Sequence, residues 1–238
     1  TVSGITTDYD GVYLRPDPPT PGAIEFNNPL PVELATFRGQ ASGNKVLLYW
    51  LTVTELFVEN YTGQLADWCQ RNRLAFTGHY MSEDTLLSQI QWGLAAAMPH
   101  YPRMTFPGVD KLGRQIGSTY GTILTVKQLD SAACQSGKER ILIENYALGG
   151  QDFAHRGRKW LGDWGAVLGA NLHNLHLALY SMRGERKRDC PPNLSFQQPW
   201  WEENHLIADY IARLSYALSQ GRRVVDILVI HPMGSAWA

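Results

Sequence analysis

Glu144 is a carboxylate at the end of a short apolar run, and this placement makes it the first residue to consider for chemistry. The run, residues 141–143, follows a helical stretch that stops at Gly137, so it is predicted to be a buried strand. Asn145 and Tyr146 come directly after Glu144. In folds of alternating strands and helices, the loops after the strands converge on one mouth, where active sites form. The alternative is a surface glutamate at the start of a loop.

Other predicted strands also end in polar side chains. Asp8 and Asp10 follow the first strand, His79 lies near the end of the second, and Asp110 follows the third. If the strands are parallel, these groups and Glu144 ring one cleft. Two carboxylates that face each other across a bond can act as acid and base, or as acid and nucleophile, as hydrolysis of a glycosidic bond requires. The sequence therefore predicts Glu144 as one catalytic carboxylate and Asp8 or Asp10 as the other.

Further polar groups of the predicted cleft suit hydrogen bonds to sugar hydroxyls. Substrate-binding roles are expected for His79, Asp110, Asn145, Tyr146 and His173. Trp200, next to Trp201, offers a flat apolar face for a sugar ring, and packing at a helix start is the alternative. His173 and His176 are not predicted to be a metal pair, because residues three apart on a strand point to opposite faces.

Strand-like and helix-like segments alternate along the chain. The predicted strands are apolar runs over residues 2–7, 74–80, 104–106, 141–146, 171–179 and 224–230. Helical spacing of apolar residues covers 46–69, 84–97, 122–136, 160–168 and 202–220. Strands separated by helices imply parallel pairing and an α/β class. Because a (β/α)8 TIM barrel needs eight strands, the chain is either an open doubly wound sheet or an incomplete barrel.

Composition and charge argue against several classes of function. The formal net charge is −1, which gives no electrostatic reason to expect nucleic acid or an anionic membrane as a partner. No apolar stretch approaches the roughly 20 residues needed to span a bilayer, and no signal peptide is visible, so the compartment stays open. The 3 cysteines are widely spaced and lack a CxxC pair, which indicates neither a disulfide framework nor a zinc site.

Several short motifs occur in the same order as in glycoside hydrolase family 106, the α-L-rhamnosidase family, and the chain resembles its catalytic region from about residue 45 onward. The motifs span residues 75–80, 107–110, 127–128, 177–184, 191–193, 198–201 and 214–219, together with the final predicted strand. The resemblance implies a (β/α)8 barrel followed by a further domain. Residues 1–222 would then be a partial barrel, and 223–238 would hold the first strand of the next domain.

One departure from the family pattern concerns the site itself. Members of the family carry Thr-Asp-Glu-Pro at the end of the fourth barrel strand, where this chain reads Thr7-Asp8-Tyr9-Asp10. Tyr9 stands in the place of the glutamate, so Asp8 or Asp10 would have to substitute for it. The family is also similar to calcium-dependent sugar hydrolases, so the resemblance allows calcium as a cofactor. It does not assign calcium ligands to particular residues of this sequence.

Two functional hypotheses follow from these residues and this resemblance. The first is a glycoside hydrolase with a carbohydrate substrate, for which the resemblance suggests terminal α-L-rhamnose. The second is a non-catalytic carbohydrate-binding protein, or an inactive relic of such an enzyme, that kept the cleft and lost a carboxylate. An incomplete barrel exposes unpaired strand edges and apolar helix faces, so self-association is also expected.

Overall fold

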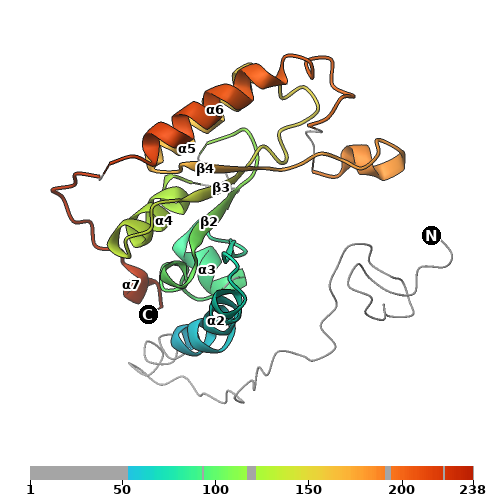
Figure 1. The fold of residues 1–238 in the computed structure, drawn as a ribbon. Coiled ribbons are helices and arrows are strands. Elements are labelled where there is room, and N and C mark those ends of the chain that lie inside the picture. Colours follow the sequence, from blue (N-terminus) through green and yellow to red (C-terminus); the bar gives the residue numbers. More distant parts are fainter. Residues whose placement is uncertain (1–52, 93, 117–121, 191–193, 222, 238) are drawn as a thin grey trace. The chain divides into compact units, whose positions relative to one another are not determined.

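The computed structural model describes residues 53–92, 94–116, 122–190, 194–221 and 223–237, all of which belong to one unit, Gly39–Ala238 (Figure 1). The first predicted strand, residues 2–7, and both Asp8 and Asp10 lie outside the described residues. Among the helices of this described part, none combines the length and the apolar character needed to cross a bilayer.

Four parallel strands form the sheet and are neighbours in the order in which they occur along the chain. They are β1 (Thr77–Gly78), β2 (Phe106–Lys111), β3 (Leu142–Asn145) and β4 (Leu172–Leu175). The connections between them carry α3 (Leu86–Trp92), α4 (Ile123–Gln135) and α5 (His155–Leu168). This arrangement confirms the predicted α/β class. It is compatible with part of a (β/α)8 barrel, and the described residues do not close one.

Further helical segments flank this set of strands. A π-helical turn, Val58–Gly63, leads into α2 (Gln64–Arg71) before β1. After β4, α6 (Asn204–Leu218) packs against α5. Single 3-10 turns span Tyr101–Arg103 and Gly184–Arg188. The strand predicted over 171–179 is therefore shorter than expected, and the helix predicted over 202–220 forms almost in full.

β2 differs from its prediction, which covered residues 104–106 and ended before Pro107 and Gly108. The strand runs through both residues, and Gly108 pairs with Leu142 of β3. A Cβ atom at Gly108 would lie 2.6 Å from the carbonyl oxygen of Gly78. Only glycine therefore lets β1 approach β2 this closely, and here Pro-Gly marks a close contact of two strands instead of a strand end.

Alternation along β2 and β3 separates the core from the polar residues. Val109 and Ile143 are register partners, are fully buried, and belong to the same core cluster as Leu129 of α4. Asp110 and Glu144 come one residue later, so their side chains leave the opposite face of the sheet. The packed face holds the strands in register, and the other face displays the carboxylates.

Asn171 joins the starts of two strands to the end of α6. Its Oδ1 accepts the N–H of Ile141 at 2.8 Å, and its Nδ2 donates to the carbonyl oxygens of Glu139 (2.8 Å) and Leu218 (3.4 Å). Asn171→Ala leaves these groups unpaired, so the free energy of unfolding in urea should fall by about 2–4 kcal/mol. Asn72 is exposed and makes one local hydrogen bond, so Asn72→Ala is the control. It should lower the free energy of unfolding by less than about 0.5 kcal/mol. Equal losses in the two variants would contradict this role.

The C-terminal segment does not form the strand predicted over residues 224–230. Residues 223–232 are neither helix nor strand, and the short helix α7 (Met233–Trp237) follows them. α7 contacts α3, and Nε1 of Trp237 donates to the carbonyl oxygen of Ala95 at 3.1 Å. A strand forms when a neighbouring strand takes up its main-chain hydrogen bonds, and no described strand pairs with this segment. The assignment of 223–238 to a following domain stays a prediction.

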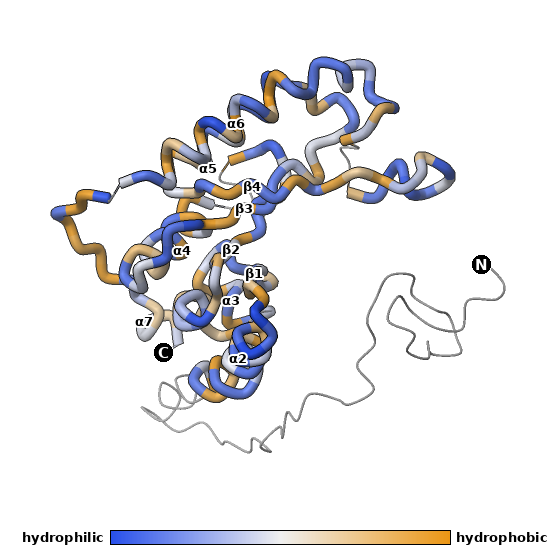
Figure 2. Tube along the Cα trace, in the orientation of Figure 1, coloured by the Kyte–Doolittle hydropathy of each residue, from blue (hydrophilic) through white to orange (hydrophobic). Residues whose placement is uncertain are grey.

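The same segment carries a run of exposed apolar side chains, seen as an orange stretch of tube (Figure 2). Six of them are between 63% and 88% exposed, namely Val224, Val225, Ile227, Leu228, Val229 and Ile230. Such a run favours association between molecules. We expect concentration-dependent self-association by light scattering, and a shift toward monomer in the double variant Ile227→Lys, Val229→Lys. Val167→Lys, at an exposed valine of α5, is the control and should leave the self-association unchanged. A wild-type protein that stays monomeric at all concentrations would refute the expectation.

Candidate functional site

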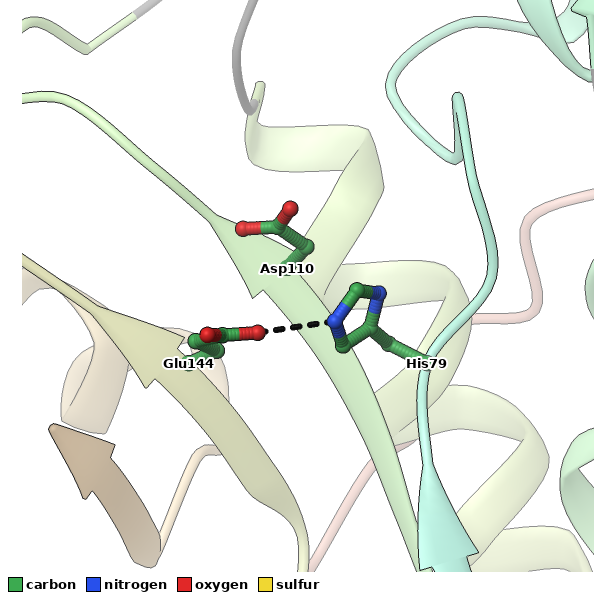
Figure 3. A group of neighbouring side chains, drawn as sticks. All are labelled: His79, Asp110 and Glu144. Atoms are coloured by element: carbon green, nitrogen blue, oxygen red, sulfur yellow. Dashed lines mark ion pairs between the residues drawn. The ribbon is translucent and has the colours of Figure 1, made fainter. Parts of the chain in front are cut away.

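Three polar side chains from successive strands meet where those strands end (Figure 3). His79 directly follows β1, Asp110 lies on β2, and Glu144, its register partner, lies on β3. Nε2 of His79 is 2.7 Å from Oε2 of Glu144, and one nitrogen or oxygen atom from each of the three lies within 4.8 Å of the others. The structure thus brings together the three described strand-end residues that the sequence assigned to one cleft. They are called the strand-end group below.

The ion pair in this group is partly exposed to solvent. The side chain of His79 is 33% exposed and that of Glu144 is 16% exposed. Burial favours a neutral ring, but Asp110, Glu83, the main-chain hydrogen bond to Tyr80 and Glu144 together outweigh it and raise the pKa of His79. The environment therefore favours an imidazolium ring at His79, paired with Glu144.

Asp110 retains a proton more readily than an ordinary aspartate. Burial raises its pKa to about 6; the charge of His79 acts against this shift, and that of Glu144 adds to it. Its Oδ1 atom is buried and has no hydrogen-bond partner among the described residues. Asp110 can consequently be protonated at mildly acidic pH beside the carboxylate of Glu144.

Glu83 is a third carboxyl group at this site, and no motif in the sequence singled it out. It lies four residues beyond His79 in the loop after β1, is 3% exposed, and accepts a hydrogen bond from the Tyr101 hydroxyl at 2.8 Å. The N–H of Asp110 points at its second oxygen at 3.4 Å. Burial raises the pKa of Glu83 to about 8, against the effects of Tyr101 and His79. The only signal in the sequence was the nearness of Glu83 to His79.

Asn145 and His173 were expected in the cleft, and the structure places them on the other face of the sheet. Asn145 follows Glu144 on the strand and is fully buried, while His173 is the register partner of core residue Ile143. Nδ2 of Asn145 and Nδ1 of His173 are 3.0 Å apart. A methyl group at Gly162 of α5 would lie 3.8 Å from the His173 ring, so this histidine packs beneath the helix. The period of two along β3 accounts for the correction at Asn145, and the register of β4 against β3 accounts for that at His173.

Tyr146 and Trp200 were also expected to bind substrate, and both have packing roles. Tyr146 is fully buried, and its hydroxyl donates to the carbonyl oxygen of Arg158 at 3.1 Å. Trp200 packs on the cluster that contains Tyr146, and its ring lies 4.3 Å from the guanidinium carbon of Arg158. The alternative reading of Trp200, packing at a helix start, agrees with these contacts.

The donors of the strand-end group do not fit calcium, the cofactor that the family resemblance allows. Calcium takes six to eight oxygen ligands. The group offers two carboxylates and one imidazole, which is a typical ligand of transition metals. Its imidazole Nε2 already engages Glu144. No metal is therefore assigned to these residues.

Comparison with known proteins shows the fold of this chain. No family model matches it, and no curated protein matches it. Among solved structures, that of a rhamnosidase from Novosphingobium sp. PP1Y matches with a TM-score of 0.61 and 21% sequence identity. The match covers 73% of this chain but 17% of the rhamnosidase. At this identity the similarity shows a common fold alone.

Proposed function

We propose that this chain carries part of the catalytic centre of a glycoside hydrolase, with Glu144 as a catalytic carboxylate. The observation that supports the proposal most is the pairing of accessible Glu144 with His79, beside an Asp110 that is easier to protonate. Neighbouring carboxyl groups held in different protonation states are a common feature of glycosidase sites. The fold, common to this chain and a rhamnosidase, favours terminal α-L-rhamnose as the first sugar to test.

The remaining groups have separate tasks in this proposal. The hydrolysed bond needs one group that protonates the leaving oxygen and one that activates water or attacks the sugar directly. Glu144 supplies one of these two functions, and Asp8 or Asp10, outside the described residues, supplies the other. Asp110 lies too close to Glu144 to form the pair of an inverting reaction, whose carboxyl groups are about 6.5–9.5 Å apart. Because the family resemblance places the second catalytic carboxylate at Asp8 or Asp10, Asp110 is assigned with His79 to hydrogen bonding with sugar hydroxyls.

A panel of aryl glycosides that includes an aryl α-L-rhamnoside tests the proposal directly. Hydrolysis of at least one member, abolished in Glu144→Gln, is the expected result. Saccharide binding by calorimetry without any hydrolysis would overturn it in favour of the carbohydrate-binding alternative. If the chain neither hydrolyses nor binds any of these saccharides, the proposed carbohydrate site itself is rejected.

A further inference from the structure

The loops after β2 and β3 are joined to each other beside the start of α5. Lys111, the last residue of β2, is fully buried, and its Nζ donates to the carbonyl oxygens of Leu112 (2.8 Å), Gly113 (3.1 Å) and Gln115 (3.0 Å). The N–H of Gly113 donates in turn to the carbonyl oxygen of Ala147, in the loop after β3. These hydrogen bonds fix the first loop against the second, so the surface that the two loops form is well defined.

Arg114 connects the two loops through its side chain. Its Nη1 and Nη2 donate to the two carboxylate oxygens of Asp152, at 3.2 Å and 2.5 Å. Its guanidinium carbon lies 5.5 Å from the ring centroid of Phe153, which is buried. A Cβ atom at Gly149 or Gly157 would overlap the Phe153 ring, so these two glycines make the space for it. The buried ring supports the ion pair at the surface.

An open cavity of about 500 Å³ lies beside this ion pair and against the first turns of α5. The residues that line it include Arg114, Asp152, Phe153, Arg156, Gly157 and Trp160. Pockets of about 300–1,000 Å³ that combine apolar surface with a few polar groups are typical ligand sites. Because its two loops follow the strands that carry Asp110 and Glu144, the cavity lies at the same edge of the sheet as the strand-end group.

The side chains in the cavity suit the different parts of a sugar acid. Trp160 is 52% exposed, and its ring can stack on a sugar ring. The pair of Arg114 and Asp152 offers donors and acceptors to sugar hydroxyls. Arg156 is exposed and forms no ion pair with any described residue, so its guanidinium can bind a carboxylate through two hydrogen bonds. Two arginines and one aspartate line the cavity, which therefore has a net positive charge.

We propose that this cavity binds a uronic acid residue of a glycan, with the carboxylate on Arg156 and the sugar ring on Trp160. The inference rests on the proposed function and narrows its substrate class to acidic glycans. A uronic acid residue would be bound in the cavity while another sugar of the same glycan is hydrolysed at Glu144. The side chains of the cavity take no part in cleaving the bond.

NMR titration of the whole 238-residue chain tests this inference without any need for turnover. The probes are the methyl glycosides of glucuronic and galacturonic acid, each compared with the neutral methyl glucoside or galactoside. At least one uronide should shift the indole N–H of Trp160 and the Nε–H of Arg156. At low salt it should bind about 5-fold or more tightly than its neutral counterpart, and salt should reduce this preference. Equal affinities within both pairs, or no shift at Trp160 with any probe, would overturn the proposal.

Two variants separate binding in the cavity from general attraction between charges. Arg156→Gln should lower the affinity for the uronide to that for the neutral sugar, and Trp160→Ala should weaken both about 5- to 10-fold. The matched controls are Arg71→Gln and Trp92→Ala, at an exposed arginine and an exposed tryptophan outside the cavity, and both should bind like the wild type. Both substituted side chains of the cavity are exposed, so the Tm should stay near that of the wild type. An equal loss of uronide binding in Arg71→Gln and Arg156→Gln would overturn the proposal.

The outcomes for this cavity and for the catalytic proposal are distinguishable. If the wild type hydrolyses no glycoside and the uronide still binds at Trp160 and Arg156, the glycosidase proposal fails and the uronic acid site stands. If a glycoside is hydrolysed and no uronide binds in the cavity, the uronic acid site alone is rejected.

Discussion

Glu144→Gln should lower turnover on a hydrolysed glycoside by about 10²–10⁴-fold, the usual contribution of one acid or base group. The amide has the shape of the carboxylate and still accepts a hydrogen bond from Nε2 of His79, so the local structure is kept. It cannot take up a proton or attack a sugar. The loss should therefore appear in kcat, with little change in KM or Tm.

The control for this prediction is Glu202→Gln, the same substitution at an exposed glutamate away from the strand-end group. It should leave kcat and Tm unchanged. A reversed pattern for Glu144→Gln, a clear fall in Tm with normal turnover per folded molecule, would show that the His79–Glu144 pair stabilises the fold and that catalysis lies elsewhere.

The meeting of His79, Asp110 and Glu144 was predictable from the sequence for a general reason. Each follows or ends a predicted strand, and parallel strands joined by helices bring their C-terminal ends to one edge. Separation along the chain therefore does not prevent contact. The register partnership of Asp110 and Glu144 is the outcome of that rule.

The errors at Asn145, Tyr146 and His173 have three different causes. Asn145 must face away from Glu144 because it is the next residue on the same strand. His173 required the register of β4 against β3, which no local pattern supplies. Tyr146 has a φ of 82°, a conformation that is uncommon outside glycine, so its direction could not be read from strand alternation.

Glu83 could not be found from the sequence, because its burial depends on residues far along the chain. Tyr101, Asp110 and Gln128 supply its partners and lie 18, 27 and 45 residues away. A carboxylate in a short polar loop looks solvated until those partners are placed. The strand through Pro107 and Gly108 was missed for a related reason, since the close approach of Gly78 is a property of the assembled sheet.

The stability of the wild type should fall as the pH rises from 4.5 to 8, relative to Glu83→Gln. Burial raises the pKa of Glu83 from 4.5 in the unfolded chain to about 8 in the folded one. Above pH 4.5 the unfolded chain loses this proton, while the folded chain keeps it until the pH approaches 8. The contribution of the protonated carboxyl group to the free energy of unfolding is therefore complete below pH 4.5 and is lost as the pH approaches 8. Over this range the expected loss is about 5 kcal/mol.

Urea denaturation of both proteins at intervals between pH 4.5 and 8.5 measures this difference. His79 and Asp110 remain in both chains, and glutamine has no proton to lose, so the difference between the two curves reports mainly on Glu83. At low pH, Glu83→Gln should be about as stable as the wild type, because the amide, like the protonated carboxyl group, accepts one hydrogen bond and donates another. It should gain on the wild type as the pH rises. Parallel curves would mean that the folded protein ionises Glu83 at an ordinary pKa, and that this carboxyl group is paired or solvated more strongly than its buried position implies.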